Sequence, residues 1–372
     1  MVAKLLFFVT EDWYFCSHRL PLAVAAKQVG YDVSVITRVR NHGDVIESAG
    51  IRVIPFENSR RSLNPFSELL VVLRLVKIYK QEKPDIVHNV AVKPVVYGAI
   101  AARIARVSNV VHALAGLGWL SSSRGKLAGL LKVLARFFLR KLLSKGRIIV
   151  QNLDDQVWLF RLGIKVSRIS LIRGSGVDIK HFIPPAESPG EPVVIVLVSR
   201  MLWDKGIGEF VEAAKVFRKL GEKAKFVLVG GPDDANPSSI SEAQLKAWDQ
   251  EGCIEWLGQR SDVADILAGS HIACLPSFYG EGVPKSLLEA LAIGLPIVTT
   301  DSPGCREVVV QKENGLLVPP RDVEKLLDAI LYLVHNPLER QRMGKASRQL
   351  VEEEFSLDKV ISETLNLYQE MI

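Results

Sequence analysis

Short apolar runs alternate with helical segments along the chain, and this alternation most constrains the fold. Parallel strands joined by crossover helices produce this order of elements, with helices on both faces of a sheet. We therefore predict an α/β protein with doubly wound parallel sheets. Strands are expected at 5–9, 33–36, 52–55, 85–88, 193–198, 226–229, 254–257, 272–275 and 297–300, and helices at 20–29, 66–81 and 356–372.

Chain length and a proline-rich segment divide the chain into two domains. The chain has 372 residues, of which 48% are hydrophobic, enough for two sizeable cores. Residues 184–192 are rich in Pro, Glu and Ser, which indicates a linker. We expect domains at 1–183 and 184–355, followed by an amphipathic helix at 356–372. The first strand is not followed by GxGxxG, which argues against a dinucleotide-dependent oxidoreductase.

Charge is divided unevenly between these domains. Residues 1–183 hold 28 of the 47 basic and 12 of the 41 acidic residues, a balance of +16, and the remainder hold 19 and 29, a balance of −10. No acidic residue occurs between Asp85 and Asp154. Such asymmetry predicts a polyanionic partner or a membrane surface for the N-terminal domain. Nucleic acid is not expected, because no nucleic-acid-binding motif accompanies the charge.

A basic amphipathic helix is predicted at residues 124–147, inside the stretch without acids. Lys132, Arg136 and Arg140 recur every four residues, opposite a leucine- and phenylalanine-rich side. This pattern is typical of helices that lie in the interface of a bilayer. The alternative is an ordinary helix whose apolar side packs on the sheet.

Other features of the whole chain favour a cytoplasmic protein, peripheral on the cytoplasmic face of the membrane. The apolar run at the N-terminus is short and ends in Glu11-Asp12, so a buried first strand is expected rather than a signal peptide. No apolar run reaches the roughly 18 residues of a membrane span. The cysteines are scattered, without CxxC or zinc spacing, and are expected to be reduced: Cys16, Cys253, Cys274 and Cys305.

Residues 277–303 contain a strand end, a Gly/Pro-rich loop and a helix from about Pro284 to Gly294. Glu281 lies in the loop, and Glu289, eight positions later, lies in the second turn of the helix. A helix N-terminus favours an anion such as a diphosphate, and carboxylates accept hydrogen bonds from sugar hydroxyls. The segment therefore fits a ligand with a phosphate centre and sugars on either side. The alternative is an amphipathic helix with two solvated glutamates.

A second loop with suitable chemistry follows the strand at 193–198. It contains Arg200 and Lys205, five positions apart and directly before a helix. Arginine offers a planar fork to phosphate oxygens, and lysine offers a mobile point charge. The alternative is that both cations form surface salt bridges.

These motifs resemble those of the retaining, nucleotide-sugar-dependent glycosyltransferases of family 4 type (glycosyl transferases group 1). The resemblance covers essentially the whole chain and implies a GT-B fold, with two facing Rossmann-like domains, parallel sheets and a deep interdomain cleft. It implies that Glu281 contacts the donor sugar, that Glu289 holds the ribose, and that Arg200 and Lys205 neutralise the diphosphate without a metal or other cofactor. The other donor-binding residues that it implies are Gly231, Leu257, Arg260, Gly282, Val283, Pro284, Lys285 and Ser286.

The acceptor side resembles bacterial enzymes that extend saccharides on undecaprenyl diphosphate. The shared segments are 59–66, 116–118 and 230–239. Thr10 to Arg19 are expected to form a loop that lacks the Gly-Gly pair of many relatives. His112 is a candidate active-site residue, with a core histidine as the alternative. The candidate acceptor-binding residues are His18, Arg60, Arg61, Gly116 and Gly118. For Arg60 and Arg61, which would bind the lipid diphosphate, the alternative is a solvated pair in a loop.

The resemblance implies a retaining hexosyltransferase in the assembly of bacterial surface or glycoprotein glycans. It would move a hexose or N-acetylhexosamine from a nucleotide-sugar, expected to be UDP-linked, to a polyprenyl-diphosphate-linked saccharide. Two alternatives remain open, namely a GT-B sugar-nucleotide 2-epimerase and a non-catalytic lipid- or polyanion-binding protein. An intact set of Glu281, Glu289, Arg200 and Lys205 argues against the binding protein.

Overall fold

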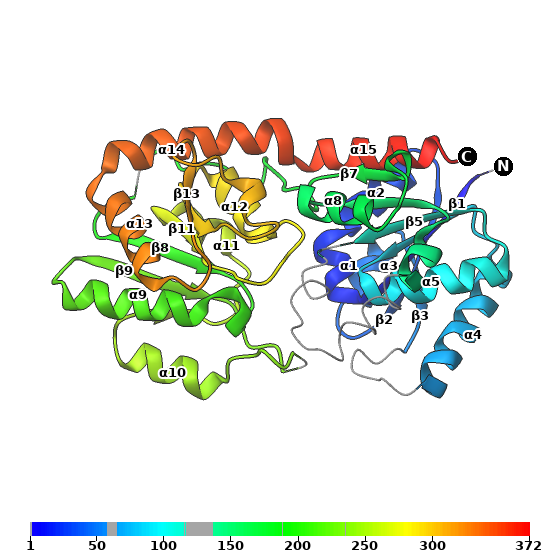
Figure 1. Ribbon diagram of the computed structural model, residues 1–372, viewed down its shortest axis with the longest axis horizontal. Helices are drawn as coiled ribbons and strands as arrows, with labels where there is room; N and C mark the ends of the chain where they lie inside the picture. The colour runs from blue at the N-terminus through cyan, green and yellow to red at the C-terminus, as the bar shows by residue number, and fades with distance from the viewer. Residues whose placement is uncertain (1, 58–64, 115, 117–136, 188, 235) are drawn as a thin grey trace. The chain divides into compact units, whose positions relative to one another are not determined.

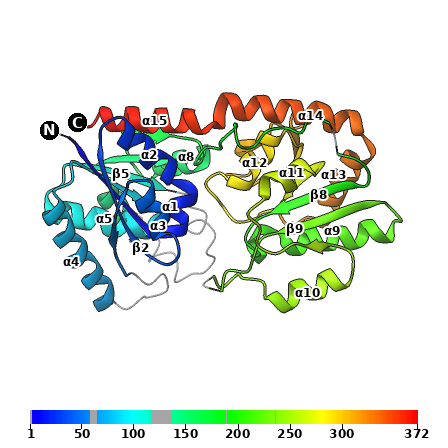
Figure 2. The same ribbon diagram turned by 180° about the vertical axis from the view of Figure 1, so that it is seen from behind.

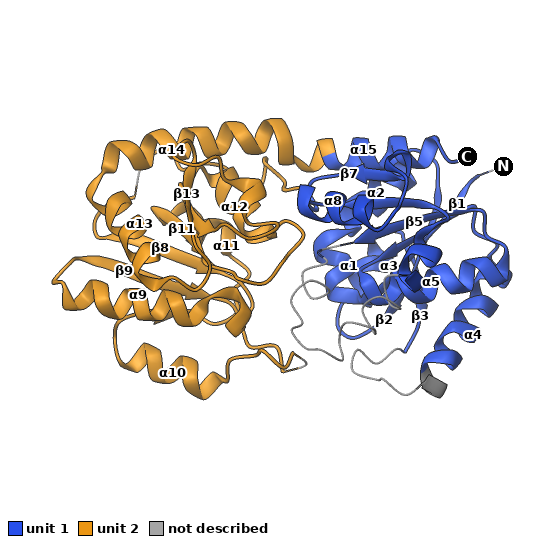
Figure 3. Cartoon of the chain, viewed as in Figure 1, with its two compact units in different colours: residues 1–175, 360–372 blue, residues 176–359 orange. Residues whose placement is uncertain are grey.

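The computed structural model describes residues 2–57, 65–114, 116, 137–187, 189–234 and 236–372 (Figure 1). The chain forms two compact units (Figure 3), one of Met1–Ser175 with Val360–Ile372 and one of Gly176–Lys359. The boundary between Ser175 and Gly176 lies before the one expected after residue 183. The boundary between Lys359 and Val360 lies after the one expected after residue 355. The segment after Gly176 belongs to the second unit because it pairs with the chain near residue 356. Val177 N–H donates to Phe355 O (3.1 Å), and Leu357 N–H donates to Val177 O (2.9 Å).

The first unit, hereafter unit 1, is a seven-stranded parallel sheet in the order β3-β2-β1-β4-β5-β6-β7. Its strands are β1 (Lys4–Glu11), β2 (Asp32–Arg38), β3 (Arg52–Pro55), β4 (Ile86–Val90), β5 (Asn109–Leu114), β6 (Arg147–Val150) and β7 (Ile169–Leu171). Its helices are α1 (Asp12–His18), α2 (Leu20–Gln28), α3 (Gly43–Ser48), α4 (Pro65–Glu82), α5 (Val92–Ala105), α8 (Leu153–Arg161) and most of α15 (Leu357–Gln369).

Alternation along β1 builds the two cores of this sheet. Phe7 packs in a cluster with side chains of α1, α2 and α15, whereas Phe8 packs in a cluster with side chains of α4 and α5. Successive strand residues face opposite sides of a sheet, so these helices cover opposite faces. In Figures 1 and 2, α15 runs beside α2. The Tyr368 hydroxyl on α15 hydrogen-bonds the buried ring of His88 in β4.

The segment expected to be a loop at 10–19 is instead largely the helix α1. Phe15 is buried and packs edge-on against Phe7 at 5.6 Å, which gives the short helix an apolar anchor. The Asp12 carboxylate accepts backbone N–H groups of Trp13, Arg40, Asn41 and His42 at 2.6–3.0 Å. Burial raises the pKa of Asp12, but these N–H donors lower it more, so its pKa lies below the usual value.

The predicted basic helix at 124–147 falls mostly outside the described residues. Its described part is helical at 137–143, where Leu139, Leu142 and Leu143 are buried and Phe137 and Phe138 are 66% and 52% exposed. In the described ranges, no helix combines the length and apolar character needed to cross a membrane.

The second unit, hereafter unit 2, is a six-stranded parallel sheet in the order β10-β9-β8-β11-β12-β13. Its strands are β8 (Val193–Val198), β9 (Ala224–Val229), β10 (Glu255–Trp256), β11 (Ile272–Leu275), β12 (Ile297–Thr300) and β13 (Gly315–Val318). Its helices are α9 (Ile207–Lys219), α10 (Glu242–Gln250), α11 (Val263–Ala268), α12 (Lys285–Ile293), α13 (Val323–His335) and α14 (Pro337–Leu350). The helix α9 packs against α13, and α12 packs against α14.

Strand order in unit 2 reverses between β8 and β11. The chain leaves β8 toward β9 on one side of the sheet, and β11, paired with β8, continues toward β12 on the other. In doubly wound sheets, ligands bind at such a reversal, beyond the carboxyl ends of the strands. The loops after β8 and β11 contain Arg200, Lys205 and Glu281, so these residues lie where a ligand is expected to bind.

Candidate active site

Lys205 and Glu281 meet at this edge of unit 2. Lys205 follows β8 in a short 3-10 turn, and Glu281 lies in the loop between β11 and α12. Lys205 Nζ forms an ion pair with Glu281 Oε2, and the two side chains are only 15% and 14% exposed. Both groups are largely removed from water, so each lowers the cost of holding the other charged.

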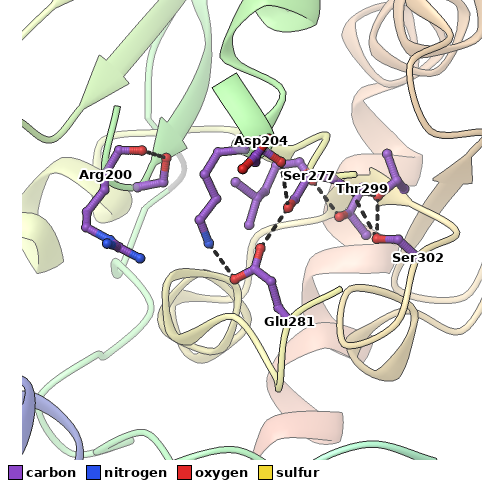
Figure 4. A network of polar contacts seen from close by, with 10 residues as sticks. Arg200, Asp204, Ser277, Glu281, Thr299 and Ser302 are labelled. Atoms are coloured by element: carbon purple, nitrogen blue, oxygen red, sulfur yellow. Dashed lines mark hydrogen bonds and ion pairs between the residues drawn. The ribbon is translucent and has the colours of Figure 1, made fainter. Parts of the chain in front are cut away.

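Ser277 completes this cluster at the end of β11. Its hydroxyl donates to Glu281 Oε1 (2.8 Å), and Figure 4 shows the two side chains directed toward one another. The backbone of Ser277 is held from behind, since its carbonyl accepts the hydroxyls of Thr300 and Ser302. Glu281 is therefore oriented by a hydroxyl that the neighbouring strand end fixes.

Arg200 lies in the same loop as Lys205 and is more exposed. Its guanidinium donates to Asp233 Oδ2 at 2.5 Å, with Asp233 in the loop after β9. Asp204 accepts the Ser238 hydroxyl (2.7 Å), which ties the loop after β8 to the same segment. These contacts place two cations and one glutamate on loops that share one edge of the sheet.

The loop that carries Glu281 is shaped by a close backbone approach at Gly304. Gly304 has φ +83°, and a Cβ there would lie 2.1 Å from Gly282 O and 2.7 Å from Glu281 O. No side chain fits in that space, so glycine is required. The Glu281 loop therefore rests directly on the backbone that follows β12.

The helix α12 begins at Lys285, as predicted, and ends at Gly294, which has φ +80°. Its N-cap is Pro284, so no side chain caps this end, and the helix dipole favours an anion in front of it. Glu289 lies in the second turn, 14% exposed and 3.7 Å from Lys285 Nζ. Burial raises the pKa of Glu289, and the nearby Lys285 offsets only part of this.

The other expected donor residues lie around this edge. Gly230, rather than Gly231, has the backbone that requires glycine, because a Cβ at φ +138° would lie 1.8 Å from Ser199 O. Arg260 follows Leu257 and is engaged by Asp262 through two hydrogen bonds of 2.8 and 2.5 Å. Gly282, Val283, Lys285 and Ser286 flank the start of α12.

The expected acceptor residues are distributed over unit 1. The His18 ring stacks on Tyr14 at 4.2 Å at the end of α1, and Gly116 follows β5 with φ +94°. Arg60, Arg61 and Gly118 lie outside the described residues. The acceptor roles of these residues stay predictions.

His112 lies in the interior of unit 1. It is 1% exposed in β5, with Nδ1 3.5 Å from Asn89 Nδ2. Burial lowers the pKa of His112 to about 4, although a hydrogen bond to the Lys145 backbone partly opposes this. Its ring reaches a pocket beside α5. This position matches the core histidine that the sequence left open, and a role in catalysis stays a prediction.

Sequence reasoning missed two groups that shape the site. Ser277 and Ser302 orient the Glu281 loop, and their signal was a serine two residues after the end of each of two neighbouring strands. Tyr279 lies in the same loop and is 38% exposed. Its pKa is raised by burial and by the charges of Asp204 and Glu281.

Two family models match the chain, Glycosyl transferase 4-like over residues 4–152 and Glycosyl transferases group 1 over residues 178–350. The chain is 31% identical over 344 residues to the N,N'-diacetylbacillosaminyl-diphospho-undecaprenol alpha-1,3-N-acetylgalactosaminyltransferase of Campylobacter jejuni, with 89% of each chain covered. It is 28% identical over 328 residues to the UDP-Gal:alpha-D-GlcNAc-diphosphoundecaprenol alpha-1,3-galactosyltransferase of Escherichia coli, with 84% of this chain and 82% of the other covered.

Solved structures match the fold over the full length. A glycosyltransferase from Rickettsia africae aligns with a TM-score of 0.80 at 19% identity, covering 100% of this chain and 98% of the other. The Anabaena protein Alr3699/HepE, in complex with UDP and glucose, aligns with a TM-score of 0.78 at 18% identity, covering 99% of each chain. At these identities the likeness concerns the fold alone.

Proposed function

The chain belongs to the glycosyl transferases group 1 family, and on that premise we propose that it transfers a hexose or an N-acetylhexosamine from a UDP-sugar to a saccharide carried on polyprenyl diphosphate. It is a glycosyltransferase of the GT-B fold. We place the reaction in the assembly of bacterial surface or glycoprotein glycans. The observation that carries the proposal is the Lys205–Glu281–Ser277 cluster, at the strand-order reversal and in front of an uncapped helix.

Support for a UDP-linked donor comes from relatives and from charge. The Escherichia coli relative is named for UDP-Gal, and the Anabaena structures contain UDP, UDP and glucose, or UDP-glucose. In this chain Arg200, Lys205 and the amino end of α12 supply the positive charge that a diphosphate needs. Glu289 is placed in the second turn of α12, where it would accept the ribose hydroxyls.

The chemistry that we propose follows from this charge distribution. The bond between the anomeric carbon and the diphosphate oxygen breaks, and negative charge grows on the departing oxygen. Lys205, Arg200 and the α12 dipole stabilise that charge without reorganising, which is commonly the largest catalytic contribution. The new bond forms from the anomeric carbon to the acceptor oxygen on the same face, which retains the configuration. The hydroxyl proton passes to the departing phosphate, so no separate base or metal ion is required.

Glu281 would orient the donor sugar during this step. Its carboxylate is fixed by Ser277 and Lys205, and a fixed carboxylate accepts sugar hydroxyls in one geometry. When a diphosphate enters, Lys205 would share its charge between the phosphate and Glu281.

A lipid-linked acceptor is supported by two relatives whose names contain diphosphoundecaprenol or diphospho-undecaprenol. We propose that the protein associates peripherally with the cytoplasmic membrane face, through the basic segment 124–147. In its described part Phe137 and Phe138 expose aromatic rings beside basic residues. Anionic lipid attracts each nearby Lys or Arg with about 1 kcal/mol.

The two alternatives are not favoured. The named relatives above are transferases, not epimerases, and they align over more than four-fifths of the chain. A non-catalytic lipid- or polyanion-binding protein would use the basic segment of unit 1, and this role gives no reason to keep the largely buried Lys205–Glu281 pair in unit 2.

The proposal is tested by nucleotide release from UDP-, GDP- and dTDP-sugars, with and without a short polyprenyl-diphosphate-linked saccharide. We expect one UDP-sugar to support release that depends on the acceptor. Glu281→Gln should abolish it, whereas Glu242→Gln, which breaks the exposed Glu242–Lys246 pair, should leave it intact. Equal release by wild type and Glu281→Gln, or release only from GDP- or dTDP-sugars, would contradict the proposal.

A further inference from the structure

A pocket lies in unit 1, at the amino end of β5. It is formed by the C-terminal turn of α5, the start of β5 and the end of the helix at 137–143, and its volume is about 270 Å³. Parallel strands share their amino ends at one edge, so this pocket lies opposite the carboxyl edge, where Gly116 follows β5. The lining residues are Ala99, Ala102, Arg103, Arg106, Val107, Ser108, Val110, His112, Leu142 and Lys145.

The pocket is strongly positive. Arg103, Arg106 and Lys145 line it, and all of its lining residues fall in the stretch between Asp85 and Asp154 that holds no acid. Among the described residues, no carboxylate forms an ion pair with any of the three cations. Two helix C-termini end beside the pocket, and each contributes roughly half a negative charge. The local balance is therefore about +2, which favours an anion.

Arg103 and the floor of the pocket are held in place. Arg103 Nη2 donates to the Leu142 carbonyl and the Ser144 hydroxyl, each at 3.2 Å, and to the Lys141 carbonyl. His112 forms the buried floor, and Ser108 adds a hydroxyl at the rim. A site with fixed donors binds a small anion without having to order itself first.

Arg106 is held in a backbone conformation that its residue type disfavours. It caps α5 with φ +63° and ψ +35°, a left-handed conformation that glycine or asparagine adopts more easily. An arginine at this position puts a long cationic side chain where a smaller residue would fold more readily. Strain of this kind supports a role for the side chain itself.

Apolar side chains complete the lining of the pocket. They come from α5 (Ala99 and Ala102), from the segment at the start of β5 (Val107 and Val110) and from the helix at 137–143 (Leu142). A lining that combines cations with apolar groups fits a phosphate that is attached to an acyl chain as well as free phosphate.

We propose that this pocket binds a phosphate group, as carried on a lipid headgroup or as free phosphate. The site is separate from the donor cluster in unit 2, so its occupancy does not depend on the transfer reaction. It adds a specific phosphate contact to the general attraction of the basic segment for an anionic surface.

The test uses the full chain, three single variants and the double variant Arg106→Asn/Lys145→Gln. Arg106→Asn removes one charge with a residue that tolerates the left-handed conformation, and Lys145→Gln removes another. Arg161→Gln is the matched control, because Arg161 is an exposed cation in the last turn of α8 in the same unit. Binding is measured as thermal stabilisation by inorganic phosphate, and as flotation with phosphatidylcholine vesicles with and without phosphatidylglycerol.

We expect Arg106→Asn and Lys145→Gln each to weaken binding about fivefold and together about 25-fold, from about 1 kcal/mol for each charge. Arg161→Gln should change it less than about twofold. Stabilisation by inorganic phosphate that the variants lose would identify a site for free phosphate. An effect on phosphatidylglycerol vesicles alone would identify a headgroup site. Unchanged binding in the double variant, or an equal loss in Arg161→Gln, would overturn the proposal.

Discussion

Lys205 and Glu281 lie 76 residues apart in the sequence and form a largely buried ion pair at the carboxyl edge of the unit 2 sheet. The pair neutralises both charges before any ligand binds. A donor diphosphate would therefore enter a site where the cation is already positioned, and it would compete with Glu281 for that cation. This arrangement links phosphate binding to the orientation of the sugar-binding carboxylate.

Lys205→Met should lower kcat about 10²- to 10³-fold, because the departing diphosphate loses a fixed charge. Steady-state nucleotide release measures this. Lys246→Met, which breaks an exposed ion pair on α10, serves as the control and should leave kcat within about twofold of wild type. A similar loss in both variants would argue against a special role for Lys205.

Gly304→Ala should lower the free energy of unfolding and displace the Glu281 loop. The added Cβ would lie 2.1 Å from Gly282 O, and its residue has φ +83°. Gly221→Ala is a matched control, because Gly221 has φ +78° and open space around its Cβ position. In both variants an alanine at positive φ costs about 1 kcal/mol. The difference between their free energies of unfolding in urea therefore measures the cost of the close contact at Gly304. Equal stability and equal activity in the two variants would contradict this account.

Glu289→Gln should stabilise the protein at neutral pH and weaken donor binding. Burial raises the pKa of Glu289, so the folded state binds a proton more tightly than the unfolded state. The contribution of this proton to the free energy of unfolding is fully present below the pKa of the unfolded state. It is lost as the pH rises through the pKa of the folded state. Glutamine at this position avoids the cost of burying an ionised carboxylate above that pH. It is, however, a weaker hydrogen-bond acceptor for the ribose hydroxyls than a carboxylate. We expect a higher free energy of unfolding at pH 8 and a KM for donor raised about 10- to 100-fold; lower stability with unchanged KM would contradict this.

Much of the fold was predictable from apolar periodicity. The strands β8, β11 and β12 and the helix α12 match the expected ranges within a residue at each end, because each is a short buried run bounded by Gly, Pro or polar residues. The sequence also predicted that Arg200, Lys205 and Glu281 lie at the same edge of the sheet, because loops that follow paired parallel strands share that edge.

Other features depend on long-range contacts that periodicity does not reveal. The helix α1 forms because Phe15 packs on Phe7 and Asp12 accepts N–H groups from a loop about 28 residues later. The strands β6, β7 and β13 were not predicted, and each has only three or four residues. The unit boundary at Gly176 depends on pairing with residues near 356, which the linker composition at 184–192 did not indicate.

His112 should make the protein less stable in acid. Burial lowers the pKa of His112 from 6.5 to about 4, so its contribution is present above 6.5 and is lost as the pH falls through 4. A shift of this size corresponds to about 3 kcal/mol. His112→Gln should therefore show a flatter loss of unfolding free energy between pH 7 and 4 than wild type. Phosphate-free buffer is needed, because an anion in the adjacent pocket would favour the charged ring; parallel pH profiles would contradict this prediction.

The mass of the lipid-linked product tests the central claim most directly. A polyprenyl-diphosphate-linked saccharide is incubated with a UDP-sugar and either wild type or Glu281→Gln. The molecular mass of the lipid-linked saccharide is then measured by mass spectrometry. The account predicts that wild type adds one hexose or N-acetylhexosamine to the acceptor and that Glu281→Gln adds none. An acceptor of unchanged mass with every UDP-sugar, while the nucleotide is still released, would contradict it.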